Sequence, residues 1–103
     1  PVQMGPVRLR RQEVTFAEGV KAVEKMKFVN LSGKPLTLSC EEAFLPECLS
    51  FRTDPVTVPA GEEGQIVISY DPSASGSRET MKVILKGLGL PPSKATITVT
   101  LTR

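Results

Sequence analysis

The feature that most limits how this chain can fold is its interruption by proline and glycine. Nine prolines and eight glycines are spread over 103 residues and leave almost no stretch long enough for a long helix. Proline removes a backbone donor and glycine weakens a helix interior, so both interrupt helices. The breaks recur roughly every eight to twelve residues, which is the spacing of turns in an all-β domain.

Between these breaks, apolar residues recur at every second position, which places one face of a strand on a core and the other in water. The last run, residues 96–102, alternates Ile, Val and Leu with threonine. In residues 65–70 the two isoleucines and the tyrosine are expected to face the core, which leaves Val67 on the wet face. Phe16–Phe28 is expected to turn at Glu18–Gly19 and continue as a strand. About seven such runs predict a sandwich of antiparallel strands in two sheets.

The absence of histidine excludes whole classes of chemistry. Ser-His-Asp and Cys-His catalysis and zinc sites with a histidine ligand all need that residue. The adjacent pairs Glu41–Glu42 and Glu62–Glu63 cannot face each other across a substrate, as the carboxylates of a glycosidase do. We therefore expect no catalytic residue, no cofactor and no metal site, and we interpret the chain as a non-enzyme.

The charge balance is only weakly basic, with a net charge of +2. The densest cationic run, Arg8–Arg11, could be a phosphate-binding arm, but no aromatic residue lies near it to stack a base, which favours a solvated edge strand. No run approaches the length of a membrane span. We expect neither a nucleic-acid partner nor a membrane-spanning segment in this piece.

Cys40 and Cys48 flank the acidic loop "EEAFLPE". Three interpretations stay open: a disulfide that closes the loop, two separate free thiols, or a redox or metal role. Spacing alone does not show whether the two Cα atoms come within bonding range. Seven residues between two cysteines also lack the tight spacing of a zinc knuckle.

Binding residues are expected in loops or along an exposed strand edge. Apolar Phe44 and Leu45 lie in a polar loop, where they could form a contact site or fold back to cap the core. The candidate contact loop consists of Glu41, Glu42, Phe44, Leu45 and Glu47. A second segment reads as a hairpin tip that could be mobile, and it consists of Gly87, Leu88, Gly89, Leu90 and Pro91.

The stretch "YDPS" ends one of the alternating runs. We expect Tyr70 to pack near the core with its hydroxyl at the rim, a common position for a buried tyrosine. Asp71 suggests a calcium ligand, but calcium takes six or more oxygen ligands and the sequence offers no set of that size here.

Two segments, "KFVNLSGKPLTL" and "PVTVPAGEEGQIVISYDPSASG", resemble the DUF1573 group and the wider ASH/MSP-like immunoglobulin-fold domains. The shared pattern is an Asn-containing turn followed by Pro-Leu, then Pro-x-Gly-x-x-Gly and Tyr-Asp-Pro. These positions are Asn30, Gly33, Pro35, Leu36, Pro59, Gly61, Gly64, Tyr70, Asp71, Pro72 and Gly76. The likeness covers roughly Val14–Leu101. The chain lacks the Cys-Gly-Cys of many DUF1573 domains, so it is similar to the second copy in tandem proteins of this group.

The resemblance implies an immunoglobulin-like domain at residues 14–103, with residues 1–13 a linker or first edge strand from a preceding domain. It implies a non-catalytic structural or interaction module of a bacterial protein that is periplasmic, outer-membrane-associated or extracellular. The expected partner is another protein or a neighbouring domain, and the isolated chain is expected to be monomeric. The alternatives are an ancillary carbohydrate- or matrix-binding domain, or a cytosolic ASH/MSP-like protein-binding domain.

Overall fold

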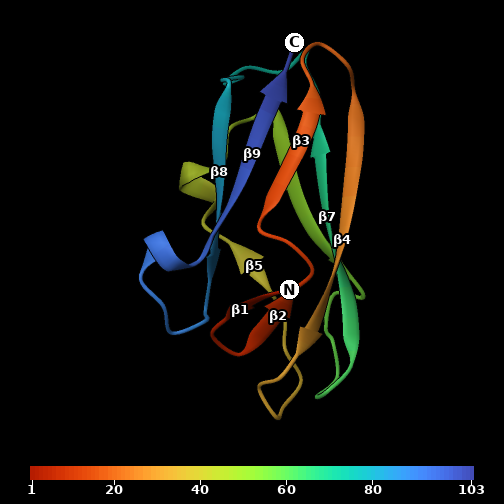
Figure 1. Cartoon of the computed structure of the whole chain (residues 1–103), viewed down its shortest axis with the longest axis vertical. Coiled ribbons are helices and arrows are strands. Elements are labelled where there is room, and N and C mark those ends of the chain that lie inside the picture. The colour runs from red at the N-terminus through yellow and green to blue at the C-terminus, as the bar shows by residue number, and fades with distance from the viewer.

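The computed structural model describes all 103 residues and shows an all-β molecule. Nine strands form two sheets that pack face to face, with two single-turn 3₁₀ helices in the loops (Figure 1). The elements are β1 (Val2–Met4), β2 (Val7–Leu9), β3 (Glu13–Ala17), β4 (Ala22–Asn30), β5 (Ser39–Cys40), η1 (Glu42–Phe44), β6 (Leu49–Asp54), β7 (Glu63–Tyr70), β8 (Thr80–Lys86), η2 (Pro92–Lys94) and β9 (Thr96–Thr102). The predicted all-β sandwich is confirmed.

The number of strands and the direction of one strand pair differ from the prediction. The five-stranded sheet runs β1-β2-β4-β7-β6 and the four-stranded sheet runs β3-β9-β8-β5, so there are nine strands and not about seven. The pairing of β3 with β9 is parallel, with Val14 opposite Val99, whereas all strands were expected to be antiparallel. A parallel pair needs a long crossover between its members, and here strands β4 to β8 lie in the chain between β3 and β9.

The first nine residues form a hairpin that extends the five-stranded sheet. β1 pairs with β2, and β2 pairs with β4, where Leu9 lies opposite Phe28. Met4, Val7 and Leu9 are buried in the same core as the other strands. The hairpin is therefore packed on this sandwich, and its origin in a preceding domain stays a prediction.

The alternation in the sequence gives the correct buried face in most strands. In β9, Ile97, Val99 and Leu101 are buried while the intervening threonines are partly or fully exposed. The chain turns at Gly19, whose φ of 79° lies in the left-handed region that favours glycine, and it then enters β4. The expected turn at Glu18–Gly19 and the strand that follows are confirmed.

Two local predictions are wrong. Val67 is only 2% exposed, although the alternation along β7 places it on the outer face of the sheet. The long side chains of Lys25 and Arg52, its neighbours on β4 and β6, stand on either side of it. The alternation in "PLTLSC" also predicts a strand, with Leu36, Leu38 and Cys40 on one face. This segment forms only the two-residue β5, and Leu36 joins Val58 through an isolated bridge. The even-numbered residues of this segment still point inward, as predicted.

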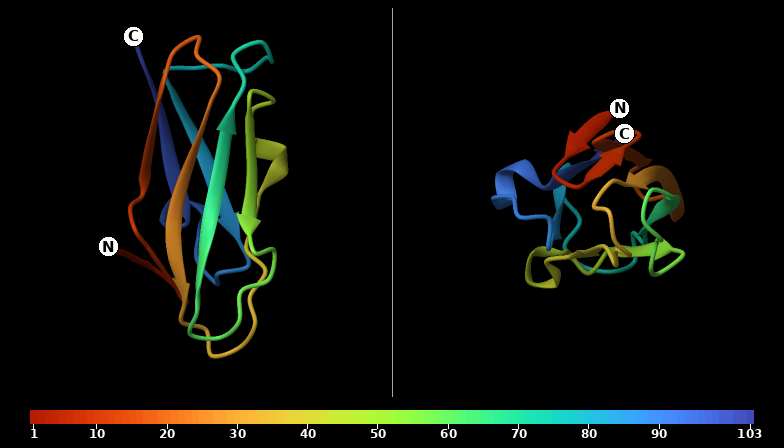
Figure 2. Two further views of the ribbon diagram at one scale, coloured as in Figure 1. Left: turned by 90° about the vertical axis from the view of Figure 1, so that its right-hand side faces the viewer. Right: turned by 90° about the horizontal axis from the view of Figure 1, so that it is seen from below.

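The core lies between the two sheets and consists mainly of aliphatic residues, with a cluster of 23 buried side chains. Its aromatic contact joins the rings of Phe16 and Tyr70, whose centroids are 5.4 Å apart. Asn30 is fully buried, and every buried side-chain nitrogen and oxygen has a hydrogen-bond partner. The molecule measures about 40 × 24 × 22 Å, and Figure 2 shows it with β4, β7 and β6 toward the viewer and, on the right, from below.

Candidate functional site

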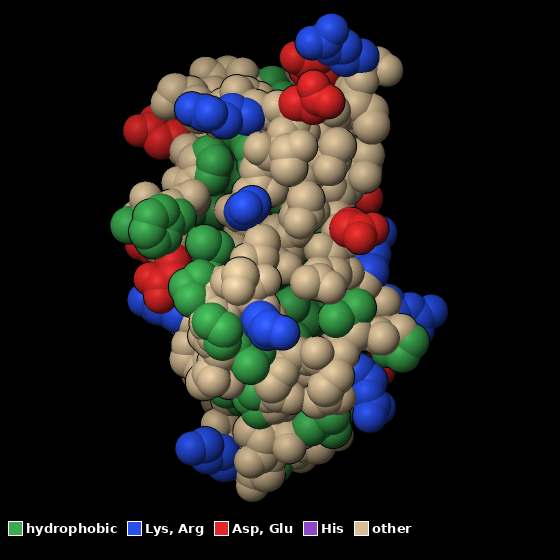
Figure 3. All heavy atoms as spheres, turned by 60° about the vertical axis from the view of Figure 1, so that its left-hand side comes forward, with side chains coloured by type: hydrophobic (Ala, Val, Ile, Leu, Met, Phe, Trp, Pro, Cys, Tyr) green, Lys and Arg blue, Asp and Glu red, His purple; other side chains and the backbone are tan.

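The predicted contact loop contains one exposed and one packed apolar residue. Phe44 ends η1 and is 69% exposed, whereas Leu45 is partly buried against the core. The contact interpretation therefore fits Phe44, and the core-capping interpretation fits Leu45. Apolar and acidic side chains meet at the left-hand edge of Figure 3, on the side of the molecule that carries η1.

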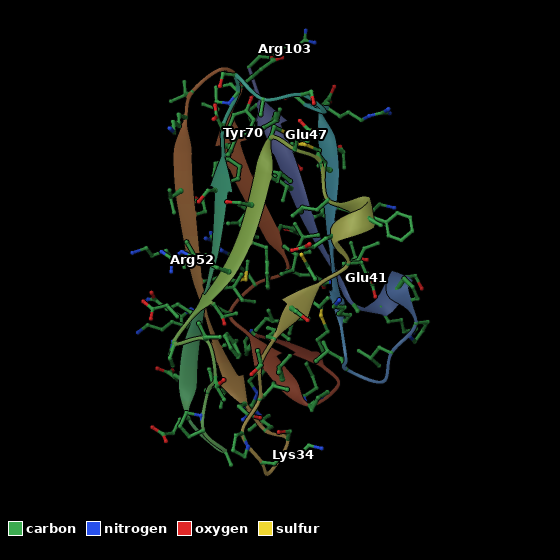
Figure 4. The ribbon with its side chains drawn as sticks, turned by 180° about the vertical axis from the view of Figure 1, so that it is seen from behind. Lys34, Glu41, Glu47, Arg52, Tyr70 and Arg103 are labelled. Carbon is green, nitrogen blue, oxygen red and sulfur yellow. The ribbon has the colours of Figure 1, made fainter.

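The acidic residues of this loop do not form one site. Glu47 lies beside Tyr70 near one end of the sandwich, and Glu41 lies near its middle (Figure 4). Glu47 accepts a hydrogen bond of 3.0 Å from the Ser75 hydroxyl, and Glu42 is exposed on η1. No three acidic or cysteine side chains gather closely enough to hold a metal ion.

The two cysteines are free thiols, and both are buried. Cys40 pairs with Leu85 of β8, while the Cys48 thiol lies 3.6 Å from the sulfur of Met81. Leu85 and Met81 are four residues apart on one strand, a separation of about 13 Å. A disulfide needs Cα atoms within about 7 Å, so the structure has the free-thiol alternative and not the disulfide.

Burial disfavours the thiolate form of both cysteines. It raises the pKa of Cys40, the nearby Glu42 carboxylate raises it further, and Lys86 opposes the change. Burial also raises the pKa of Cys48. A reactive cysteine needs a lowered pKa and an accessible sulfur, and neither cysteine has both.

The hairpin tip at Gly87–Pro91 is attached to the sandwich by two leucines. Leu88 is buried, Leu90 is partly buried against the core, and both lie close to Gly5 in the β1–β2 turn. The glycines on either side of Leu88 have positive φ, which lets the chain turn sharply there. The mobility suggested for this segment stays a prediction.

Tyr70 and Asp71 stabilise loops at the end of the sandwich. The Tyr70 hydroxyl accepts a hydrogen bond of 3.3 Å from the Gly19 N–H and lies 3.4 Å from the Ser77 hydroxyl. The hydroxyl and the N–H of Ser73 donate to one oxygen of Asp71, which lowers the pKa of that carboxyl. Both polar groups are thus engaged in local turns.

The sequence did not predict the groove that lies between edge strands β5 and β6. Its lining combines the apolar residues Leu38, Cys40, Phe51 and Val56 with the charged residues Glu42, Arg52 and Lys86. Figure 4 shows β5 and β6 on the same side of the molecule, with Glu41 beside β5 and Arg52 on the far side of β6. The one sequence signal was Val56, an apolar residue that lies between two prolines and is 69% exposed.

The outer edge of β6 has backbone groups without partners. The N–H of Asp71 donates to the carbonyl of Cys48, so even-numbered residues of β6 face β7. Antiparallel ladders alternate, and the N–H and C=O groups of Phe51 and Thr53 therefore point away from the sheet. No backbone hydrogen bond outside the ladders includes either residue. At six residues, β6 is also the longest of the four edge strands.

Comparisons with known proteins do not place the chain in a family. No family model matches it, and no curated protein is similar to it. The structure contains no helix with the length and apolar character needed to cross a bilayer.

Proposed function

We propose that the chain is a non-catalytic, immunoglobulin-like structural and interaction module of a bacterial cell-envelope or secreted protein. It contacts another protein, or a neighbouring domain of its own chain, by pairing along the outer edge of β6. The envelope location and the DUF1573-like character rest on the sequence resemblance. The contact surface is inferred from the outer edge of β6 and the groove beside it.

The observation behind this proposal is the free edge of β6 beside two exposed apolar side chains. Phe51 offers its backbone donor and acceptor outward, as a strand does when another strand is added to it. The backbone groups of Thr53 have the same orientation, but this residue is only 6% exposed. Val56 lines the adjacent groove, and Phe44 ends the 3₁₀ helix whose first residue, Glu42, lines it too. Backbone pairing would supply affinity, and the apolar groove would select side chains.

Natural sheets usually protect such an edge with charge, proline or a bulge. The outward-facing Arg52 is the only basic residue within β6, and no proline interrupts the strand. Pro55 follows directly after its last residue, Asp54, and so leaves the six paired positions intact. This edge is thus less protected than the three-residue β1 or the two-residue β5.

The test selects extended peptides from a random library on the immobilised chain and maps the binders by NMR. We expect slowed amide exchange at Phe51, and weaker binding by a Phe44→Ser/Val56→Ser variant. Val20→Ser/Leu31→Ser is the matched control, because it removes two exposed apolar side chains elsewhere. Binders that protect other strands, or equal loss in both variants, would contradict the proposed contact surface.

The location is tested separately on the native protein. Fractionation of the source cells, followed by detection with an antibody raised against this chain, should place it in the envelope or the medium. Detection in the cytosolic fraction alone would reject the envelope proposal and leave the β6 contact untouched.

A further inference from the structure

The outer face of the five-stranded sheet gathers basic side chains from three strands and a loop. We call this surface the cationic face. Its basic members are Arg8, Arg10, Arg11, Lys25, Lys27 and Arg52. They are nearly half of the 13 basic residues of a chain whose net charge is only +2, so the charge is concentrated here.

Strand pairing brings these residues together from separate runs of sequence. The N–H of Arg10 donates to the Lys27 carbonyl at 3.0 Å, which continues the β2–β4 ladder beyond Leu9. The Arg11 guanidinium donates to the Lys25 carbonyl at 3.4 Å. The two arginines that follow β2 therefore lie beside the two lysines of β4.

The pairing of β4, β7 and β6 extends the face sideways. Lys25 lies opposite Val67, and Val67 lies opposite Arg52. Long basic side chains cover apolar neighbours with their aliphatic stems and keep the charge in water. This explains why Val67 is 2% exposed on an outer face, and it holds the charges close to the sheet. β4, β7 and β6 face the viewer in the left-hand view of Figure 2.

Few carboxylates neutralise this surface. Arg11 makes an ion pair of 3.9 Å with Glu24, but no other member of the cationic face has an ion-pair partner. The two acidic residues of the face, Asp54 and Glu63, lie at strand ends. By contrast, basic side chains stand apart from one another over β8 and β9 in Figure 3.

An open hollow of about 540 Å³ lies within the cationic face. Arg10, Arg11, Lys25 and Lys27 line it together with Met26 and Gln65, and no acidic residue does. A guanidinium offers paired donors that match a phosphate or sulfate, and an ammonium adds a compact charge. No aromatic side chain lines the hollow, so it has no platform on which a base or a sugar ring could stack.

We propose that the cationic face binds ligands that have two or more adjacent phosphate or sulfate groups, with these groups held in the hollow at Lys25 and Lys27. This site goes beyond the proposed function and uses a different surface from the β6 edge. The ligand is recognised by its clustered oxyanions. Its source is either a free polyphosphate or the headgroups of an anionic membrane.

The experiment measures binding of sodium tripolyphosphate to the whole chain by calorimetry at low ionic strength. We expect saturable binding that a Lys25→Gln/Lys27→Gln variant weakens about tenfold, because two charges that contact the anion are lost. Amide signals of Lys25, Lys27 and Gln65 should shift in NMR spectra on titration. Circular dichroism confirms that the exposed substitutions leave the fold intact.

The matched control is Lys82→Gln/Lys94→Gln, which removes the same charge from exposed positions of β8 and η2. Its affinity should stay within about twofold of the wild type, since remote charges act only through the screened long-range field. Equal weakening in the two variants, or no saturable binding by the wild type, would overturn the site.

Two further probes distinguish the two sources of the ligand and test the main alternative, a docking surface for acidic proteins. If the chain sediments with phosphatidylglycerol vesicles and the Lys25→Gln/Lys27→Gln variant does not, the ligand is the lipid headgroups. If the chain binds tripolyphosphate but does not sediment with the vesicles, the ligand is a free polyphosphate. Either result supports the clustered-oxyanion site. Poly-glutamate that binds as tightly as tripolyphosphate would instead identify a docking surface for acidic proteins and reject the proposal.

Discussion

The side-chain amide of Asn30 donates a hydrogen bond to the carbonyl of Val58, 3.0 Å away, and so joins segments 28 positions apart. The same amide also donates to the carbonyls of Lys34 and Pro59, while its oxygen accepts from the N–H and hydroxyl of Ser32. One fully buried side chain thus connects the turn after β4 to the turn before β7. The Asn in the turn motif of the sequence has this physical role.

Replacing Asn30 with alanine should lower the free energy of unfolding by about 3 kcal/mol, because several buried backbone groups lose their partner. Asn30→Asp should cost at least as much at neutral pH, since its carboxylate would face three carbonyl oxygens. Urea unfolding measures both effects. Ser32→Ala is the control and should cost about 1 kcal/mol or less. A loss below about 1 kcal/mol for Asn30→Ala would show that the two turns hold without it.

Gly64 leaves no room for a side chain between β7 and its neighbours. A Cβ at this position would lie 2.5 Å from a methyl carbon of Val58 and 3.0 Å from the ring of Phe28. Gly64→Ala should therefore destabilise the protein by about 2 kcal/mol through overpacking. Urea unfolding of the single variant is the measurement.

A double-variant cycle tests this cause. Val58→Ala creates space next to Gly64, so its cost should be smaller in the Gly64→Ala background than in the wild type. The sum of the stability losses of the two single variants should then exceed the loss of the double variant. Simple additivity would mean that the contact with Val58 is not the source of the strain.

Local alternation of apolar and polar residues predicted the strand faces because successive side chains of a strand point to opposite faces of the sheet. In β9, Ile97, Val99 and Leu101 are buried and the threonines between them are partly or fully exposed, as the pattern indicated. No local pattern in the sequence indicates that β3 pairs in parallel with β9, since the direction of a partner strand depends on the whole topology. The hairpin of β1 and β2 was also missed, because three-residue strands are too short to show a period.

For the candidate site too, the sequence predicted what depends on neighbouring residues and missed what depends on strand pairing. The apolar residues of the loop were expected either to form a contact site or to cap the core; Phe44 is exposed and Leu45 is packed, and the sequence could not tell the two apart. The cationic face was invisible because Arg8–Arg11 and the lysines of β4 lie in different runs. Only the pairing of β2 with β4 places them side by side.

The Tyr70 hydroxyl should contribute modestly to stability. Tyr70→Phe removes its contacts with the Gly19 N–H and the Ser77 hydroxyl but keeps the ring against Phe16. Both contacts are long, so we expect a loss of about 1 kcal/mol. Faster amide exchange at Gly19 should accompany it. The exposed Ser77→Ala should cost less than about 0.5 kcal/mol, and an effect as large as that of Tyr70→Phe would move the main contribution to the serine.

Both buried thiols should resist modification in the native state. Iodoacetamide at neutral pH should add almost nothing to Cys40 and Cys48 in the folded protein, because it needs an accessible thiolate. After unfolding in guanidinium without a reductant, mass spectrometry should find two added groups. Addition only after reduction would reveal a disulfide and contradict the free thiols of the structure.

The raised pKa values of Cys40 and Cys48 also predict how stability depends on pH. Both folded pKa values lie above the ordinary value of 9.0. Below that value the thiols are neutral in both states and add no pH dependence. As the pH rises past it, the unfolded chain releases protons that the folded protein retains, so the free energy of unfolding falls. Urea midpoints between about pH 7 and 10 should show this decline, and it should be shallower in Cys40→Ala/Cys48→Ala. Parallel curves for the two proteins would assign the decline to other groups.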